Sequence, residues 1–197
     1  MWKRALLFTA AFSATGAASA DVILGAQVGK QSLDVKQTNS FGETDKDTID
    51  SDTSFGLVIG VGEPGGGSRI IGEWAGFEIG DNVELDILTV AYSYFFNGVA
   101  VSSSAQLRPF VGADLGYGWL DVSAIPGYNS GDDANFTYGA RAGLNLAFAK
   151  TAELEIGVRY GVVNLEAELD SRIPFLDPAY YEVENNQSWW IGLNFGL

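Results

Sequence analysis

The sequence predicts an all-β chain that closes into an eight-stranded antiparallel up-and-down barrel. In eight segments, large apolar residues alternate with small or polar ones, which is typical of a strand with two unlike faces. No window of the chain has a sustained helical period. An even number of strands is also what a closed antiparallel barrel with both termini on one side requires.

The first four segments cover residues 21–30, 53–62, 68–79 and 83–96. Their large apolar side chains fall on one face of each strand: Val22, Leu24, Ala26, Val28, Phe55, Leu57, Ile59, Val61, Ile70, Trp74, Leu88, Val90, Tyr92, Tyr94 and Phe96. The third segment is the least regular, and there we expect Arg69, Glu73 and Phe77 on the opposite face.

The last four segments cover residues 108–120, 135–148, 152–162 and 188–197. Their apolar faces are cleaner: Val111, Ala113, Leu115, Tyr117, Trp119, Phe136, Tyr138, Ala140, Ala142, Leu144, Leu146, Phe148, Leu154, Ile156, Val158, Tyr160, Val162, Trp189, Ile191, Leu193, Phe195 and Leu197. The residues between them are mostly glycine or polar, so each strand has one apolar face and one small or polar face.

The connections differ in length in a regular way. Short turns are predicted at residues 63–68 and 149–151. Long, polar and acidic loops are predicted at residues 31–52, 121–134 and 163–186. Short turns at one end and long loops at the other are typical of outer-membrane barrels. Two connections fit less well, because residues 80–83 are shorter and residues 97–106 longer than this pattern expects.

The two unlike faces decide between a soluble and a membrane barrel. In a soluble barrel the apolar face would point inward, and its many aromatic rings would overfill an interior of eight strands. In a membrane barrel the apolar face meets lipid and the glycine-rich face lines a narrow lumen. Closure also satisfies every backbone group, as the bilayer core demands. The sequence therefore favours a transmembrane barrel.

The first twenty residues predict export. "MWKR" carries two cations, "ALLFTAAFSATGA" is apolar, and "ASA" ends at Ala20 with small residues at Ala18 and Ala20. This three-part pattern is typical of a secretory signal peptide. We therefore expect a signal peptide over residues 1–20 and a single barrel domain over residues 21–197.

Composition excludes several function classes. Removing Lys3 and Arg4 changes the formal net charge from −14 to −16, which argues against a nucleic-acid partner. The chain has no cysteine and no histidine. It therefore forms no disulfide, and it lacks the general base on which outer-membrane enzyme families such as lipid A deacylases depend.

One constellation of charges is predicted to face the lumen: Glu73, Asp114, Arg141, Glu153, Glu155 and Arg159. Unpaired charges in a narrow lumen are strongly unfavourable, so these should pair or meet water. We favour an internal salt-bridge network that plugs the barrel, and a polar path for small ions is the alternative. If the hairpin over residues 121–134 is symmetric, Asp114 faces Arg141, and we predict an ion pair between them.

The stretches "LRPFVGADLGYGWLDV", "FTYGARAGLNLAF" and "ELEIGVRYGV", together with the closing strand, resemble the small eight-stranded outer-membrane family of the OmpA transmembrane domain, OmpX and the opacity-type proteins. The resemblance covers residues 21–197. It implies a location in the outer membrane of a Gram-negative bacterium, with outer-membrane lipid and lipopolysaccharide around the chain. It also implies insertion by the barrel-assembly machinery, which reads the last strand. The signal residues there are Trp189, Ile191, Leu193, Phe195 and Leu197.

Two further motifs carry little chemistry. "GEPGGGSR" (62–69) lacks the lysine and the following helix of a phosphate loop, and no cofactor is indicated. Segment 43–52 groups Glu43, Asp45, Asp47, Asp50 and Asp52, which could hold calcium, although a solvated acidic loop is the default.

Three functions remain open at this point. We favour a non-enzymatic surface protein whose loops 31–52, 121–134 and 163–186 meet an unknown extracellular partner. A narrow porin-like channel is the alternative, and an outer-membrane lipid-modifying enzyme is the weakest reading.

Overall fold

The computed structural model describes residues 21–50, 53–62, 67–79, 82–123, 127–149, 151–173 and 177–197. Every regular element in these residues is a strand: β1 (Asp21–Thr38), β2 (Thr44–Asp50), β3 (Ser54–Gly62), β4 (Ser68–Ile79), β5 (Val83–Phe95), β6 (Val99–Ser102), β7 (Ala105–Val122), β8 (Gly131–Ala149), β9 (Ala152–Leu169) and β10 (Ala179–Gly196). The described residues contain no helix that is long and apolar enough to cross a membrane. The predicted signal peptide, residues 1–20, lies outside the described residues.

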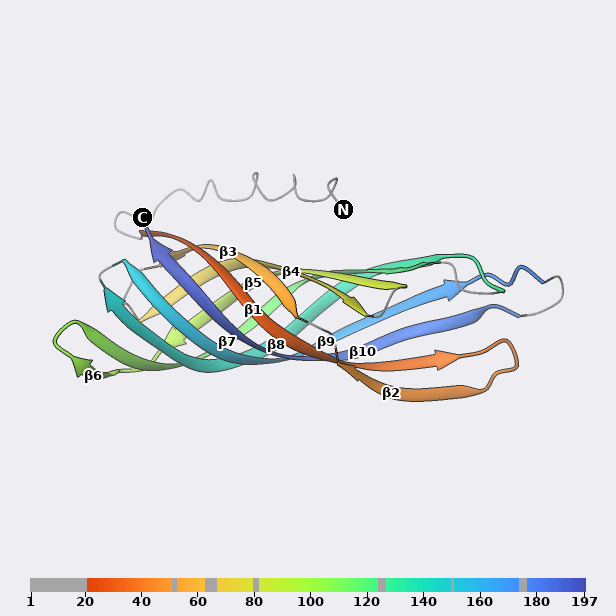
Figure 1. Cartoon of the computed structure of the whole chain (residues 1–197), viewed down its shortest axis with the longest axis horizontal. Coiled ribbons are helices and arrows are strands. Elements are labelled where there is room, and N and C mark those ends of the chain that lie inside the picture. Colours follow the sequence, from red (N-terminus) through yellow and green to blue (C-terminus); the bar gives the residue numbers. More distant parts are fainter. Residues whose placement is uncertain are drawn as a thin grey trace.

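The strands form one closed antiparallel barrel (Figure 1). Each long strand pairs with its neighbours in the sheet order β10-β9-β8-β7-β5-β4-β3-β1, and β1 pairs back to β10 from Ile23↔Gly196 to Thr38↔Tyr180. β3 pairs with the first half of β1, and β2 pairs with the same edge of β1 further along, from Ser32 to Thr38. β6 pairs only with β7. The predicted all-β, eight-stranded closed barrel is therefore confirmed.

The two ends of the barrel differ. Both ends of the described chain meet at one end, which we call the terminal end, where the backbone N–H of Leu197 donates to the carbonyl oxygen of Val22 at 2.8 Å. The β6–β7 hairpin also lies there, and the β1–β2 and β9–β10 hairpins lie at the opposite, distal end (Figure 1). The β6–β7 hairpin accounts for the unexpected length of residues 97–106.

Two of the three segments predicted as long loops, 31–52 and 163–186, consist largely of strand, so the prediction is wrong for these two; of 121–134, only the ends belong to strands β7 and β8. β1 continues to Thr38 and turns back as β2, β9 continues to Leu169, and β10 already begins at Ala179. Alternation persists in these segments, but with reversed polarity: Leu33, Val35, Val163, Leu165, Tyr181 and Val183 are buried. The acidic residues between them face outward, which made the segments look like solvated loops.

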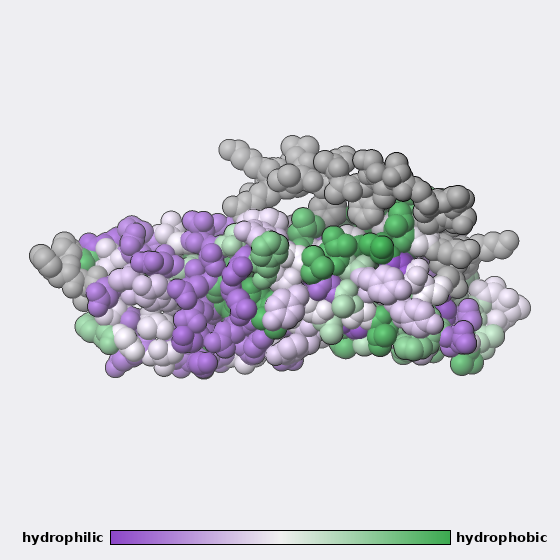
Figure 2. Space-filling view, turned by 180° about the vertical axis from the view of Figure 1, so that it is seen from behind, coloured by the Kyte–Doolittle hydropathy of each residue, from purple (hydrophilic) through white to green (hydrophobic). Residues whose placement is uncertain are grey.

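The reversal divides the barrel into two tiers. In the terminal tier the outward side chains are apolar, for example Leu57, Leu115 and Val158, each more than half exposed. In the distal tier the inside holds an apolar core: Leu33, Val35, Val83, Leu85, Ile87, Leu120, Val122, Val163, Leu165, Ala167, Leu169, Ala179, Tyr181 and Val183. Figure 2 shows the corresponding exteriors, hydrophilic over the distal tier and largely hydrophobic over much of the terminal tier.

One strand needs an irregularity to keep its core residues inside. In β10 the register shifts between Val183 and Asn185 against both neighbouring strands. Val183 is buried on one side of this shift, and Asn186 is buried on the other. The bulge at Glu184 thus changes which residues of β10 face inward, as bulges commonly do.

Candidate functional site

The inside of the terminal tier is charged. The described residues place four arginines and four carboxylates there, all at most 9% exposed: Arg69, Glu73, Arg108, Asp114, Arg141, Glu153, Glu155 and Arg159. Six of these are the predicted lumen residues. Arg69 was predicted to point inward but was not assigned to the network, and Arg108 was not predicted. The numbers of positive and negative groups are equal, so the buried set is formally neutral.

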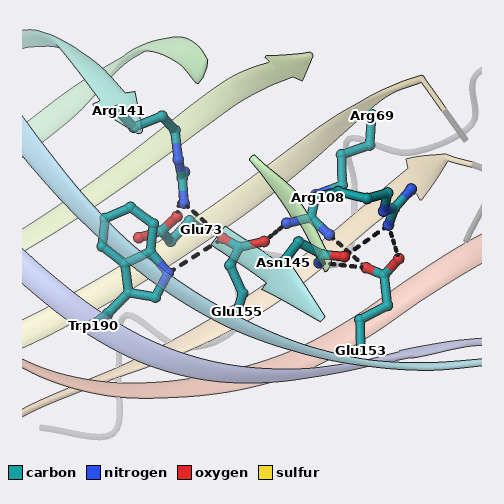
Figure 3. A network of polar contacts seen from close by, with 8 residues as sticks. All are labelled: Arg69, Glu73, Arg108, Arg141, Asn145, Glu153, Glu155 and Trp190. Carbon is teal, nitrogen blue, oxygen red and sulfur yellow. Dashed lines mark hydrogen bonds and ion pairs between the residues drawn. The ribbon is translucent and has the colours of Figure 1, made fainter. Parts of the chain in front are cut away.

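The group nearest the terminal end is centred on Glu153 (Figure 3). Arg69 donates from Nη1 to Glu153 Oε2 at 2.9 Å, and Arg108 donates from Nη2 to Glu153 Oε1 at 2.7 Å. Asn145 joins them, because its Oδ1 accepts from Arg108 at 2.7 Å and its Nδ2 donates to Glu153 at 3.1 Å. The two guanidinium groups lie 4.7 and 4.8 Å from the ring centre of Phe95. One carboxylate and one aromatic ring thus share two cations.

A second group lies further along the lumen (Figure 3). Arg141 donates from Nη1 to Glu73 Oε2 at 2.8 Å, and its Nη2 is 3.6 Å from Glu155 Oε1. Its guanidinium lies 4.5 Å from the ring centre of Trp190, whose indole N–H donates to Glu155 at 3.3 Å. Gln27 donates to the other oxygen of Glu73 at 2.5 Å. Glu155 also forms an ion pair with Arg69 of the first group, so the two groups are connected.

The third group lies closest to the distal core. Arg159 donates from Nε and Nη2 to the carboxylate of Asp114, with a shortest distance of 2.7 Å. Its Nη1 donates to Asn186 Oδ1 at 3.2 Å, and Nη2 to the Thr137 hydroxyl at 3.4 Å. Asn186 in turn donates to Gln31. The Arg159 guanidinium therefore has partners on three further strands.

The predicted ion pair between Asp114 and Arg141 is wrong. The β7–β8 register sets Arg141 opposite Gly112, and Asp114 opposite Gly139, two residues away from the predicted pairing. The hairpin closes with Val122 opposite Gly131, so its midpoint is earlier in the chain than a symmetric loop over 121–134 would place it. Arg141 and Arg159 are direct cross-strand partners, and each bonds a different carboxylate.

The lumen has little free space at this level. A cavity of about 20 Å³ lies beside Gln27, Gln31, Ser54, Glu73 and Trp190. That volume holds about one water molecule. Beyond Arg159 the apolar core of the distal tier begins, so the charged groups, with two smaller apolar clusters beside them, occupy one half of the barrel and the main apolar core the other.

At the distal end, the connecting segments contact one another. Tyr128 pairs with Ser171 in an isolated bridge, and its hydroxyl contacts the hydroxyl of Ser40 near the β1–β2 turn. The backbone N–H of Arg172 donates to the carbonyl oxygen of Gly127 at 2.9 Å. Tyr128 also packs against the apolar core, so these segments cover it.

The two other predicted sites also have a defined place. In the last strand Trp189, Ile191, Leu193 and Phe195 are 39–47% exposed on the outer face, and Leu197 is 74% exposed. The acidic segment 43–52 is mainly the exposed strand β2, and Asp52 lies outside the described residues. Within the described residues, no three His, Cys, Asp or Glu side chains are grouped closely enough to hold a metal ion.

Comparison with solved structures identifies the fold. The chain superposes on Neisserial surface protein A with a TM-score of 0.61 and 14% identity, over 91% of this chain and 99% of that one. The outer membrane protein OprG from Pseudomonas aeruginosa gives 0.57 and 13%, over 90% and 97%. The N-terminal β-barrel domain of Pseudomonas aeruginosa OprF gives 0.52 and 15%, over 91% and 100%.

The chain has the fold of the small eight-stranded outer-membrane barrels. The family resemblance predicted from the sequence is thus confirmed at the level of the fold, and the predicted location agrees with that of these neighbours. No protein-family model and no curated protein sequence matches the chain.

Proposed function

We propose that the protein is a non-enzymatic outer-membrane barrel that displays its acidic distal tier at the cell surface for interaction or adhesion. The observation that carries this proposal is the reversal of polarity along the strands. The terminal tier is apolar outside and charged inside, which suits lipid. The distal tier is polar outside and apolar inside, which suits water.

The strand lengths support the same placement. β9 and β10 have 18 residues each. At about 3.3 Å per residue and a tilt of about 40°, such strands rise about 45 Å along the barrel axis, whereas the apolar band of these barrels is about 25 Å tall. The strands are therefore long enough to carry the distal tier well clear of the hydrocarbon.

The proposed display surface is acidic. Outward carboxylates of the distal tier include those of Asp34, Glu166, Glu168, Glu182 and Glu184, and few cations accompany them. Phe41 at the β1–β2 turn is 80% exposed and Ile173 is 54% exposed. These apolar tips on an acidic surface are suited to a partner with basic groups around an apolar patch.

Because the chain has no cysteine, single introduced cysteines test the orientation. Asp47→Cys on β2 should react with a membrane-impermeant maleimide on intact cells. Ser103→Cys in the β6–β7 turn should react only after the outer membrane is broken. Equal reaction of both variants on intact cells would overturn the proposed orientation.

The alternative of a narrow channel meets two obstacles, the ion-pair groups and the apolar distal core. We expect no steady conductance from purified protein in planar bilayers. Regular openings that disappear in Arg141→Gln would favour the channel and contradict a purely structural role for the network.

Export and assembly belong to the same proposal. We propose that residues 1–20 are removed on export and that the barrel-assembly machinery reads the last strand. N-terminal sequencing of membrane-extracted protein should begin at Asp21. A sequence that begins at Met1 would contradict the export step.

A further inference from the structure

A shallow groove of about 650 Å³ crosses the outer surface of five neighbouring strands, β7, β8, β9, β10 and β1. Its first row consists of successive cross-strand partners: Val111, Ala142, Val158, Trp189 and Lys30. Its second row is built in the same way: Ala140, Tyr160, Gln187 and Ser32. The floor is therefore small and apolar at Ala140 and Ala142, and the end on β1 and β10 is polar.

The groove runs obliquely from the edge of the apolar band into its depth. On β1 the outward residues change at Lys30 from apolar to polar, whereas on β7 apolar outward residues continue beyond Val111 as far as Trp119. From β7 to β1 the groove crosses four strand-to-strand spacings of about 4.8 Å each. Because the strands are tilted by about 40°, its two ends differ in depth by about 12 Å. Lys30 thus lies at the polar boundary and Val111 within the hydrocarbon.

Lys30 is the cation at this boundary. Lys36 and Lys46 on the distal tier form ion pairs with Glu182 and Glu184. The side chain of Lys30 has neither an ion pair nor a hydrogen bond within the part of the chain that the structure describes. On the distal side of Lys30, the hydroxyl of Ser32 donates a hydrogen bond to the carboxylate of Asp50.

We propose that this groove binds one phosphorylated acyl lipid of the surrounding bilayer, with its phosphate at Lys30 and an acyl chain on Ala140 and Ala142. A lysine beside an anionic headgroup is electrostatically favourable, and Trp189 and Tyr160 are the amphipathic rings that occur at a membrane boundary. The small alanines leave room for the chain between the larger neighbours. The inference rests on the membrane placement proposed above.

Full-length barrel in nanodiscs of equal phosphatidylglycerol and phosphatidylcholine tests it, with the lipids retained by the protein counted by native mass spectrometry. Wild-type protein should retain one phosphatidylglycerol with about five-fold preference, the size expected for one lysine near a headgroup. Lys30→Gln should abolish the preference, and Ala142→Phe should abolish retention. The matched controls Lys46→Gln and Ala26→Phe, which lie outside the groove, should behave as wild type.

Several results would overturn the proposal. These are an unchanged preference in Lys30→Gln, a loss of retention in the control variants, displacement of the lipid by soluble glycerol phosphate, or a dimer whose formation Ala142→Phe prevents. Failure of the wild-type protein to insert into nanodiscs would contradict the membrane placement itself. Insertion without any lipid preference would contradict only the groove.

Discussion

Arg159 on β9 donates three hydrogen bonds to the carboxylate of Asp114 on β7, with distances of 2.7 to 3.0 Å across the intervening strand β8. Asp114 is 6% exposed and Arg159 is 9% exposed, so water contributes little to the solvation of either charge. Removing one member of such a pair leaves the other charge buried without its partner.

The first prediction concerns this pair. Asp114→Asn and Arg159→Gln should each lower the free energy of unfolding by about 3–5 kcal/mol, and the double variant should lose less than the sum. Urea unfolding of the refolded barrel in lipid vesicles measures the cycle. The exposed pair Lys46–Glu184, at 3.6 Å, is the matched control and should show coupling near zero. Additive effects at Asp114 and Arg159 would contradict the ion pair.

The second prediction tests the lipid-facing surface. Leu193 lies at the middle of the outward apolar row of β10, so Leu193→Arg should destabilise the barrel by about 2–4 kcal/mol and reduce its assembly. Gln187→Arg lies on the same face of the same strand, at the polar boundary, and should assemble normally. The fraction of protein that migrates as a folded band on unheated SDS gels measures both. Equal behaviour of the two variants would show that the terminal tier does not face lipid.

The third prediction concerns the close approach of Gly157 to Trp190. A Cβ atom at position 157 would lie 2.2 Å from the indole ring, which is buried beneath Arg141. Gly157→Ala should therefore displace the ring and destabilise the barrel by about 1–3 kcal/mol. Unfolding monitored by tryptophan fluorescence measures the loss. In the background of Trp190→Leu the same glycine substitution should cost much less, and an unchanged cost would contradict the steric explanation.

The fourth prediction concerns Tyr181 in the core of the distal tier. Burial raises the pKa of Tyr181 to about 12 from its ordinary value of 10. Because the folded-state pKa is the higher one, this residue contributes stability that is complete below about pH 10 and is lost as the pH rises through about 12. Absorbance of tyrosinate should show a late-ionising component that is missing in Tyr181→Phe. The same variant should unfold with a weaker dependence on alkaline pH, and an identical dependence would contradict the burial.

The sequence predicted the barrel and the inward and outward faces of its terminal tier because alternation with a period of two survives local irregularities. It could not fix the register, since the glycines around Asp114 and Arg141 permit more than one pairing. Parity could have identified Arg108, because the alternation that places Phe110 and Gly112 inside also places Arg108 inside. The distal tier was missed for a different reason. Val163 and Leu165 alternate as regularly as Leu154 and Ile156 do, but their apolar side chains face the opposite way.

The antiparallel ladder between β9 and β10 stays paired from Phe195↔Ala152 to Ala179↔Leu169, with a single register shift at the boundary between the tiers. No hinge therefore separates the terminal tier from the distal tier along these two strands. In the proposed membrane placement, the distal surface is therefore held rigidly at a fixed height and a fixed angle relative to the bilayer. Many copies in one membrane would present the same surface at the same level. A partner with repeated binding sites could then engage several copies at once without losing the entropy of ordering flexible arms.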